Sequence, residues 1–128
     1  MAASPLIIVD AANVIGSTPN GWWRDRLGAT RRLRDRLGPL TRHGLSHWPQ
    51  PPPISVILVT EGAARGLESN DNVTVVDAPG QADDTIVDLV VEHAPTPTVV
   101  ITSDRHLQHR VTTEGAHTLP VSALKPLK

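Results

Sequence analysis

The sequence predicts an α/β fold built on a mainly parallel β-sheet. Short, continuous runs of aliphatic and β-branched residues alternate along the chain with segments in which apolar residues recur at helical spacing. The runs lack the polar alternation of half-exposed strands, so we expect strands that are buried on both faces. Such strands alternating with helices are typical of parallel sheets with right-handed crossovers. The 128 residues contain no repeat, and we expect one domain spanning 1–128.

Five segments have the composition of strands. Four of them are rich in Ile, Val or Leu, and each of these ends at an acidic or turn-forming residue. The last segment is shorter, and we expect it at the edge of the sheet. The predicted strands are 6–9, 54–60, 73–76, 98–102 and 117–120.

Three segments between these strands have the spacing of amphipathic helices. The first spans 22–40 and is expected to break near its end, where Gly and Pro occur together. The second spans 81–93, and the third is expected to start from Ser103 as N-cap and run to Gly115. Their predicted buried stripes are Ala29, Leu33, Leu37 and Leu40, then Ile86, Leu89, Val90 and His93, then Leu107 and Val111.

The composition excludes several kinds of chemistry. Because there is no cysteine, disulfides, Cys-ligated zinc, iron–sulfur clusters and thiol catalysis are all excluded. The six histidines form no zinc-binding motif. The apolar run 6–9 ends at Asp10 and is too short for a signal peptide or a membrane span, so we expect a cytoplasmic protein.

The charges are segregated along the chain. Seven of the ten arginines lie within 24–42, whereas 61–104 holds nine acids and a single base. This asymmetry is expected where a polyanion meets a cation-binding site, although an ordinary solvated helix face explains the arginines equally well.

Acidic residues follow the first four predicted strands. They are Asp10, Glu61, Asp77 and Asp104, and Asp83 and Asp84 start the helix after the third strand. Ligands of open α/β sheets bind beyond the carboxyl ends of the strands, so we expect these acids to converge. A divalent ion with oxygen ligands, Mg²⁺ or Mn²⁺, would offset their mutual repulsion, and phosphodiester hydrolysis is the simplest chemistry that follows.

Each acid taken singly also has a structural interpretation, as a cap or a turn residue. We interpret Asp77 as a turn residue. Asp83 lies nearer the buried stripe of its helix than Asp84 or Asp88 and is the better metal ligand, but Asp84 stays open because first-turn residues can lean over the sheet edge. Asn13 can orient a water or a phosphate, or can equally form a cap or turn.

Three motifs, 7–15, 82–86 and 99–105, together resemble the acidic motifs of the NYN domain, in particular its YacP-like branch, within the PIN-like nuclease superfamily. The resemblance implies a PIN-like three-layer α/β/α sandwich and metal-dependent ribonuclease activity. It also implies Asp10, Asp83 and Asp104 as metal-binding acids, with Asn13 beside them and Glu61 after the second strand.

Two features depart from the YacP-like pattern. Ala11-Ala12 replaces its Gly-aromatic pair, and Val87 stands where an acid is expected, with Asp88 one step along. The second departure leaves the fourth ligand, and therefore the number of metal ions, open.

The expected function is therefore a ribonuclease that uses Mg²⁺ or Mn²⁺ to hydrolyse RNA. The expected partner is RNA, free or on the ribosome, and a homodimer is left open. Alternatives are an RNA- or ribosome-binding module without catalysis, a hydrolase of free nucleotides, and the toxin of a toxin–antitoxin pair. The candidate catalytic residues are Asp10, Asn13, Glu61, Asp83 and Asp104, and the candidate metal ligands are Asp10, Asp83, Asp84 and Asp104. The candidate phosphate-binding residues are Arg24, Arg31, Arg32 and Arg34. Trp22 and Trp23 are candidates for base stacking or for packing.

Overall fold

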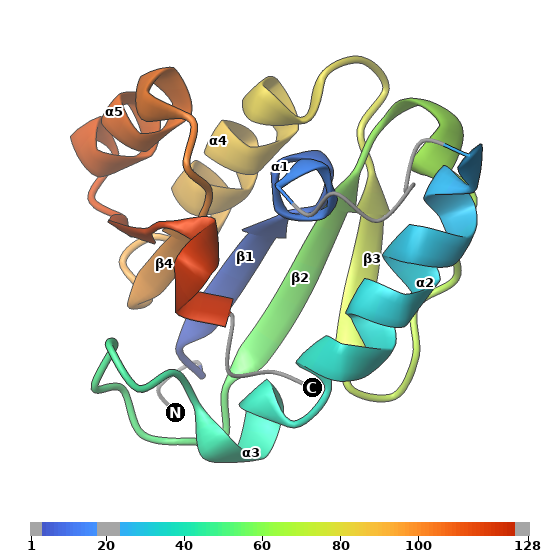
Figure 1. Ribbon diagram of the computed structural model, residues 1–128. Helices are drawn as coiled ribbons and strands as arrows, with labels where there is room; N and C mark the ends of the chain where they lie inside the picture. Colours follow the sequence, from blue (N-terminus) through green and yellow to red (C-terminus); the bar gives the residue numbers. More distant parts are fainter. Residues whose placement is uncertain (1–3, 18–23, 125–128) are drawn as a thin grey trace.

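A computed structural model describes residues 4–17 and 24–124. Its centre is a five-stranded sheet in which every neighbouring pair of strands is parallel, in the order β3-β2-β1-β4-β5 (Figure 1). The expected parallel α/β fold is confirmed. The strands are β1 (Leu6–Asp10), β2 (Ser55–Thr60), β3 (Val73–Asp77), β4 (Thr98–Ile101) and β5 (His117–Leu119).

The strand register sets the carboxyl ends of three strands level with one another. Asp10 is opposite Val59 across β1 and β2, and Thr60 is opposite Asp77 across β2 and β3. Since all strands run in the same direction, the loops that leave β1, β2, β3 and β4 emerge at one edge of the sheet.

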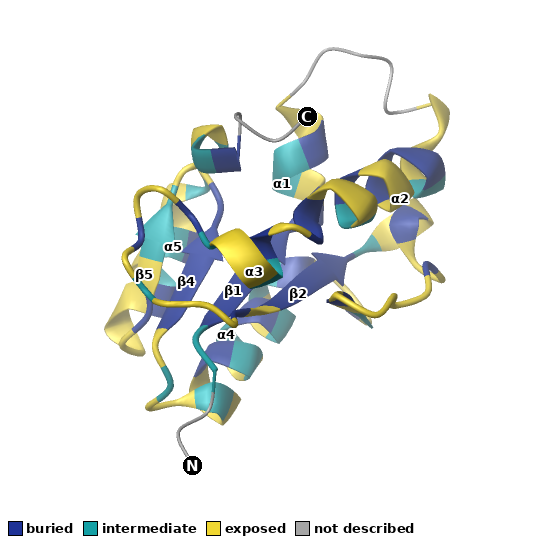
Figure 2. Ribbon diagram, turned by 90° about the horizontal axis from the view of Figure 1, so that it is seen from below, coloured by how far each residue is buried: buried dark blue, intermediate teal, exposed yellow. Residues whose placement is uncertain are grey.

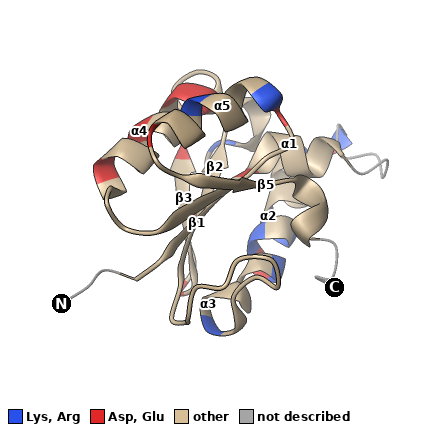
Figure 3. Cartoon of the chain, turned by 90° about the vertical axis from the view of Figure 1, so that its left-hand side faces the viewer, with Lys and Arg blue, Asp and Glu red and all other residues tan. Residues whose placement is uncertain are grey.

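Helices cover both faces of the sheet and give a three-layer α/β/α arrangement. Figure 3 shows α4 and α5 on one side of the strands and α1, α2 and α3 on the other. The helices are α1 (Ala11–Gly16), α2 (Arg26–Leu37), α3 (Leu40–His43), α4 (Ala82–His93) and α5 (Arg105–Thr113), and two 3-10 turns are η2 (Gly62–Ala64) and η3 (Val121–Leu124).

Successive residues of each strand point to opposite faces, so the sheet separates two aliphatic cores. Ile7 and Val9 of β1 pack with Leu33 and Leu37 on the side of α2. Ile8 packs with residues of α4 and α5 on the other side. Figure 2 shows the strands as largely buried, with exposed residues on the outer sides of the helices. The central strands are thus a rigid support for the loops at their ends.

The helix boundaries differ from the sequence prediction in three places. The first predicted helix begins at Arg26, capped by Asp25, and ends before Gly38, while Trp22 and Trp23 lie outside the described residues. The short α1 was not predicted. The prediction of Ser103 as the N-cap of α5 is wrong, because Asp104 takes that place. Among the described residues, no helix has the length and apolar character needed to cross a membrane.

Candidate active site

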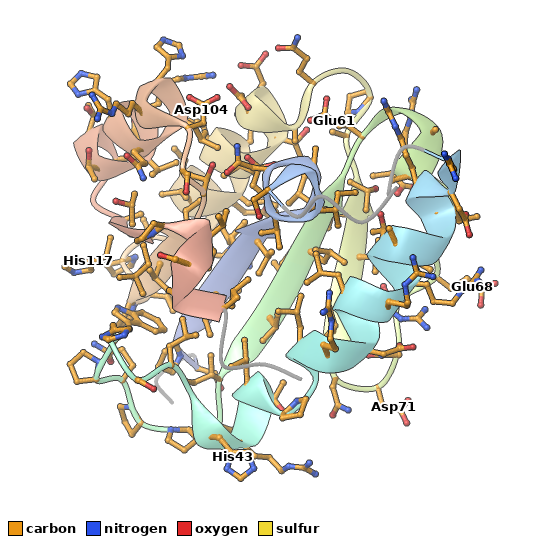
Figure 4. All side chains as sticks on the ribbon, viewed as in Figure 1. His43, Glu61, Glu68, Asp71, Asp104 and His117 are labelled. Atoms are coloured by element: carbon orange, nitrogen blue, oxygen red, sulfur yellow. The ribbon has the colours of Figure 1, made fainter. Side chains whose placement is uncertain are left out.

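A hollow of about 320 Å³ lies at the carboxyl edge of the sheet, where the acids were expected to converge. Figure 4 shows Glu61 and Asp104 at this edge, beyond the strands and on either side of α1. Four carboxylates from four separate parts of the chain therefore line one hollow, and the negative charges of two of them, Asp83 and Glu61, act on Asp10. The lining residues are Asp10, Ala12, Asn13, Glu61, Gln81, Asp83 and Asp104.

Asp10 is the most buried of these carboxylates. It ends the central strand β1, is 4% exposed, and caps α1 by accepting a hydrogen bond from the backbone N–H of Asn13 at 3.5 Å. Burial raises the pKa of Asp10 to about 6, and the negative charges of Asp83 and Glu61 add to the rise. Hydrogen bonds from Thr102 and Asn13 oppose the increase. Asp10 is therefore a carboxylate that is costly to keep charged without a cation nearby.

Thr102 was not singled out from the sequence, yet it connects two acids of the hollow. Its hydroxyl donates to Asp10 Oδ2 at 3.0 Å and accepts from the backbone N–H of Asp104 at 3.2 Å. The residue is fully buried. The only sequence signal was a threonine at the end of the predicted fourth strand, two residues before Asp104.

Asn13 and Asp104 both take structural roles beside the hollow. Asn13 Oδ1 accepts a hydrogen bond from the backbone N–H of Ser103 at 2.8 Å, which ties α1 to the loop after β4. Asp104 Oδ1 accepts from the backbone N–H groups of His106 and Leu107 at 2.9 and 3.2 Å. Within the described residues, the side-chain NH₂ of Asn13 and the second carboxylate oxygen of Asp104 make no hydrogen bond.

The two acids that begin α4 have different surroundings. Asp83 is half-buried and lines the hollow. Asp84 does not line it, because its side chain is 85% exposed and pairs with Arg110 at 2.9 Å. Asp88 is exposed one turn further along. The geometry therefore favours Asp83 over Asp84 as the acid that faces a ligand.

Glu61 and Asp77 also differ, although each ends or follows a strand. Glu61 lines the hollow, and its carboxylate accepts no hydrogen bond from any residue that the structure describes. Asp77 stays outside the lining and accepts hydrogen bonds from the Thr60 hydroxyl and the backbone N–H of Gly66, in keeping with a turn residue. Gln81, which was not predicted as a site residue, lines the hollow from the N-cap position of α4.

The sequence matches no protein-family model and no curated protein. Two crystal structures of Rae1 (YacP) from Bacillus subtilis, one of them of a substituted variant, do superpose on the chain. The variant gives a TM-score of 0.76 at 21% identity, over 95% of this chain and 73% of that chain. The other gives 0.74 at 21% identity, over 94% and 71%. The fold is similar to that of Rae1. The Rae1-like part includes the sheet and the helices on both of its faces, since almost the whole chain is aligned.

The donor atoms of this Rae1-like fold suit a hard divalent cation, but they do not form a ready cage. Carboxylate oxygens suit a hard ion such as Mg²⁺, which commonly keeps several waters and uses only one or two carboxylates. Within 4–17 and 24–124, no three acidic or histidine side chains stand in an arrangement that would hold an ion. An ion at this hollow would therefore have few direct contacts with the described side chains and would keep several waters.

The arginines selected as phosphate-binding residues lie on and beside α2. Arg24, Arg31 and Arg32 are exposed. Arg34 is partly buried, pairs with Asp35 at 3.0 Å and donates to the Glu68 carbonyl at 2.7 Å. Figure 3 shows basic residues along α2 and acidic residues around α4, so the segregation of charge in the sequence is also a segregation in space.

Proposed function

We propose that this chain is a divalent-metal-dependent ribonuclease of the NYN type, within the PIN-like superfamily, that hydrolyses phosphodiester bonds of RNA in the hollow. One observation carries the proposal. The central strand ends in a buried carboxylate, Asp10, whose pKa is raised to about 6 and which shares the hollow with Glu61, Asp83 and Asp104. A protein keeps such a repulsive cluster when a cation offsets it.

Asp10, Asp83 and Asp104 are the residues that would hold Mg²⁺ or Mn²⁺, directly or through water. When bound, the ion lowers the pKa of a bound water and neutralises charge that develops on the scissile phosphate. The bonds from Thr102 and from the Asn13 backbone N–H keep the Asp10 carboxylate in one orientation. With this orientation, Asp10 would meet an ion from a fixed direction at the end of β1.

Glu61 is the residue that would accept a proton from the attacking water. Its carboxylate is not committed to any hydrogen bond in the described chain, so it can serve as a general base. The NH₂ group of Asn13 makes no hydrogen bond in the part of the chain that the structure describes, since only the Oδ1 of this side chain is used, and it can donate to a phosphate oxygen or to the water. Arg24, Arg31 and Arg32 extend phosphate binding away from the hollow, and Arg34, Trp22 and Trp23 remain part of the proposed RNA surface.

Two further observations support the proposal. The fold is similar to that of Rae1 at TM-scores of 0.76 and 0.74. The three motifs that resemble the YacP-like branch also supply three of the four acids of the hollow.

The test is to incubate the purified chain with labelled RNA, both free and on ribosomes, and with a labelled nucleoside triphosphate. Each reaction is run with Mg²⁺, with Mn²⁺ and with chelator. We expect RNA cleavage that needs the ion and that D10N abolishes. D71N is the matched control, because Asp71 is an exposed carboxylate that Figure 4 shows at the opposite end of the molecule.

The other outcomes separate the alternatives. Equal RNA binding by the unsubstituted protein and D10N, with no cleavage by either, would indicate an RNA-binding module. Hydrolysis of the nucleotide alone would indicate a nucleotide hydrolase. Cleavage that D71N reduces as strongly as D10N would place the chemistry outside the hollow.

A further inference from the structure

We propose that the outward face of α5, formed by Arg105, His106, His109 and Arg110, is a second phosphate-binding surface. It holds the RNA strand on the side of the hollow away from α2. This inference rests on the proposed function, but it names a surface and a strand path that the carboxylate site alone does not require.

The four side chains share one side of the helix. Arg105 and His109 are four residues apart, as are His106 and Arg110, and such pairs are neighbours on a helix surface. Arg105, His106 and His109 are exposed, and Arg110 is partly exposed. There is no acidic residue within α5 itself. The face is therefore a continuous row of nitrogen donors.

The opposite side of α5 anchors the helix firmly. Leu107 and Val111 are fully buried in the core beside α4. The Gln108 side chain donates a hydrogen bond of 2.8 Å to the Thr102 carbonyl at the end of β4. Because the helix is tied to the sheet edge in this way, the row of donors has a defined position relative to the hollow.

The donors of the row are available to a ligand. The side chains of Arg105, His106 and His109 make no hydrogen bond or ion pair with any described residue. The imidazole ring keeps at least one N–H donor in either protonation state. Arg110 pairs with Asp84 at 2.9 Å, so the charge of this acid of α4 is already offset. A phosphate approaching this face therefore meets donors and no unpaired carboxylate on the helix.

Backbone and hydroxyl groups of α5 do not offer an alternative binding site. Asp104 Oδ1 already accepts hydrogen bonds from the backbone N–H groups of His106 and Leu107. The hydroxyls of Thr112 and Thr113 donate to carbonyls one turn back in the helix. Recognition on this face thus depends on the arginine and histidine side chains.

The row continues directly from the hollow. Asp104 lines the hollow, and Arg105 is the next residue in the chain. Arg105 is the first residue of α5, and Figure 1 shows α2 and α5 on opposite sides of α1. An RNA strand whose scissile phosphate sits in the hollow can therefore meet cations of α2 on one side and of α5 on the other.

The test measures binding of a labelled single-stranded RNA in a D10N background, which separates affinity from cleavage. Affinity is determined at several salt concentrations for D10N alone and with R105Q, H109Q or both. The control is R42Q, because Arg42 is an exposed arginine of α3, next to His43, which Figure 4 shows at the opposite end of the molecule. Circular dichroism spectra verify that each variant is folded.

We expect R105Q to lower the slope of log affinity against log salt by about 0.7, the amount that corresponds to one phosphate of a single strand that the protein no longer neutralises. Adding H109Q to R105Q should weaken RNA binding further, without a comparable change in the slope of log affinity against log salt. R42Q should change neither the affinity nor the slope. Cleavage by R105Q in the chain that retains Asp10 should weaken through KM rather than kcat, because Arg105 binds substrate outside the hollow.

Three results would overturn the inference. If R105Q and H109Q match R42Q while the protein still cleaves RNA, α5 is not on the strand path and only this inference fails. If D10N binds no RNA and the unsubstituted chain cleaves no RNA, the proposed function fails together with this inference. If polyglutamate displaces the labelled RNA as effectively as unlabelled RNA of equal charge, and R105Q weakens polyglutamate binding more than RNA binding, the row serves an acidic peptide and not RNA.

Discussion

The hydroxyl of Thr102 donates a hydrogen bond of 3.0 Å to Asp10 Oδ2, although the two residues are 92 positions apart in the sequence. Both residues are buried. The same hydroxyl accepts a hydrogen bond from the backbone N–H of Asp104. One buried hydroxyl thus sets the orientation of a carboxylate at the end of β1 and the position of an acid after β4.

Removing this hydroxyl tests the connection. T102V should lower ribonuclease activity by about 10- to 100-fold, the usual effect of losing a group that orients a metal-binding residue. It should also raise the pKa of Asp10 further, since a hydrogen bond to the charged form is removed. The pH dependence of cleavage measures this effect and should shift to higher pH.

T102S is the control, because it keeps the hydroxyl and removes only a methyl group. It should retain most of the activity. An unchanged pH profile in T102V, with an activity loss that follows its thermal stability alone, would mean that Thr102 only supports packing.

The raised pKa of Asp10 should make the free energy of unfolding of the metal-free protein depend on pH. The folded state binds the Asp10 proton more tightly than the unfolded chain, so the contribution of this group to the free energy of unfolding falls as pH rises from about 4 to about 6. A rise from 3.8 to about 6 corresponds to about 3 kcal/mol. D10N should therefore be more stable than the unsubstituted chain at pH 7, by up to about 3 kcal/mol.

Denaturant unfolding with chelator present, at several pH values, measures this difference. It should shrink as pH is lowered towards 4, because Asp10 then becomes neutral in the unsubstituted chain. Asparagine is as good an N-cap as aspartate, so loss of the α1 cap does not confuse the comparison. A D10N protein that is less stable at every pH would contradict the account of Asp10 as a costly buried charge.

Asp83 and Asp84 are adjacent in sequence and are expected to behave differently. D83N should strongly reduce cleavage, because Asp83 lines the hollow. D84N should leave kcat unchanged and cost at most about 1 kcal/mol of stability through loss of the exposed pair with Arg110. Steady-state kinetics of both variants decide the matter, and equal loss of kcat in the two would show that either acid can serve.

Glu61 is expected to act through proton transfer. E61Q should reduce kcat by about 10²- to 10⁴-fold, the range for loss of a general base. The affinity for RNA should change little, because Glu61 is proposed neither as a phosphate-binding residue nor as a direct metal ligand. Single-turnover cleavage and RNA binding measured on the same preparation separate these effects, and a loss confined to RNA affinity would exclude the role of base.

The strands and the convergence of acids were predictable because they depend on local patterns. Continuous apolar runs identify buried parallel strands, and their carboxyl ends must share one edge of the sheet. Asp10, Glu61, Asp83 and Asp104 follow from this topology. The helical spacing also indicated that Asp83, rather than Asp84, lies near the buried side of α4, in agreement with their exposures.

Other features depend on contacts that a sequence pattern does not contain. The six residues of α1 are too few to display a helical period, so the helix that Asp10 caps was not predicted. Ser103 and Asp104 are both good N-caps, and the choice between them depends on which side chain reaches the first free N–H groups. The link from Thr102 to Asp10 joins two distant strands and exists only in the folded sheet.

Calorimetric titration of the chelator-treated protein with Mn²⁺ tests most directly whether the carboxylates at the sheet edge share a cation. We predict saturable binding at neutral pH that is lost or greatly weakened in D10N and in D83N, and that D71N leaves intact. Binding that is the same in all four proteins, or no binding at millimolar Mn²⁺ with or without RNA present, would contradict the account.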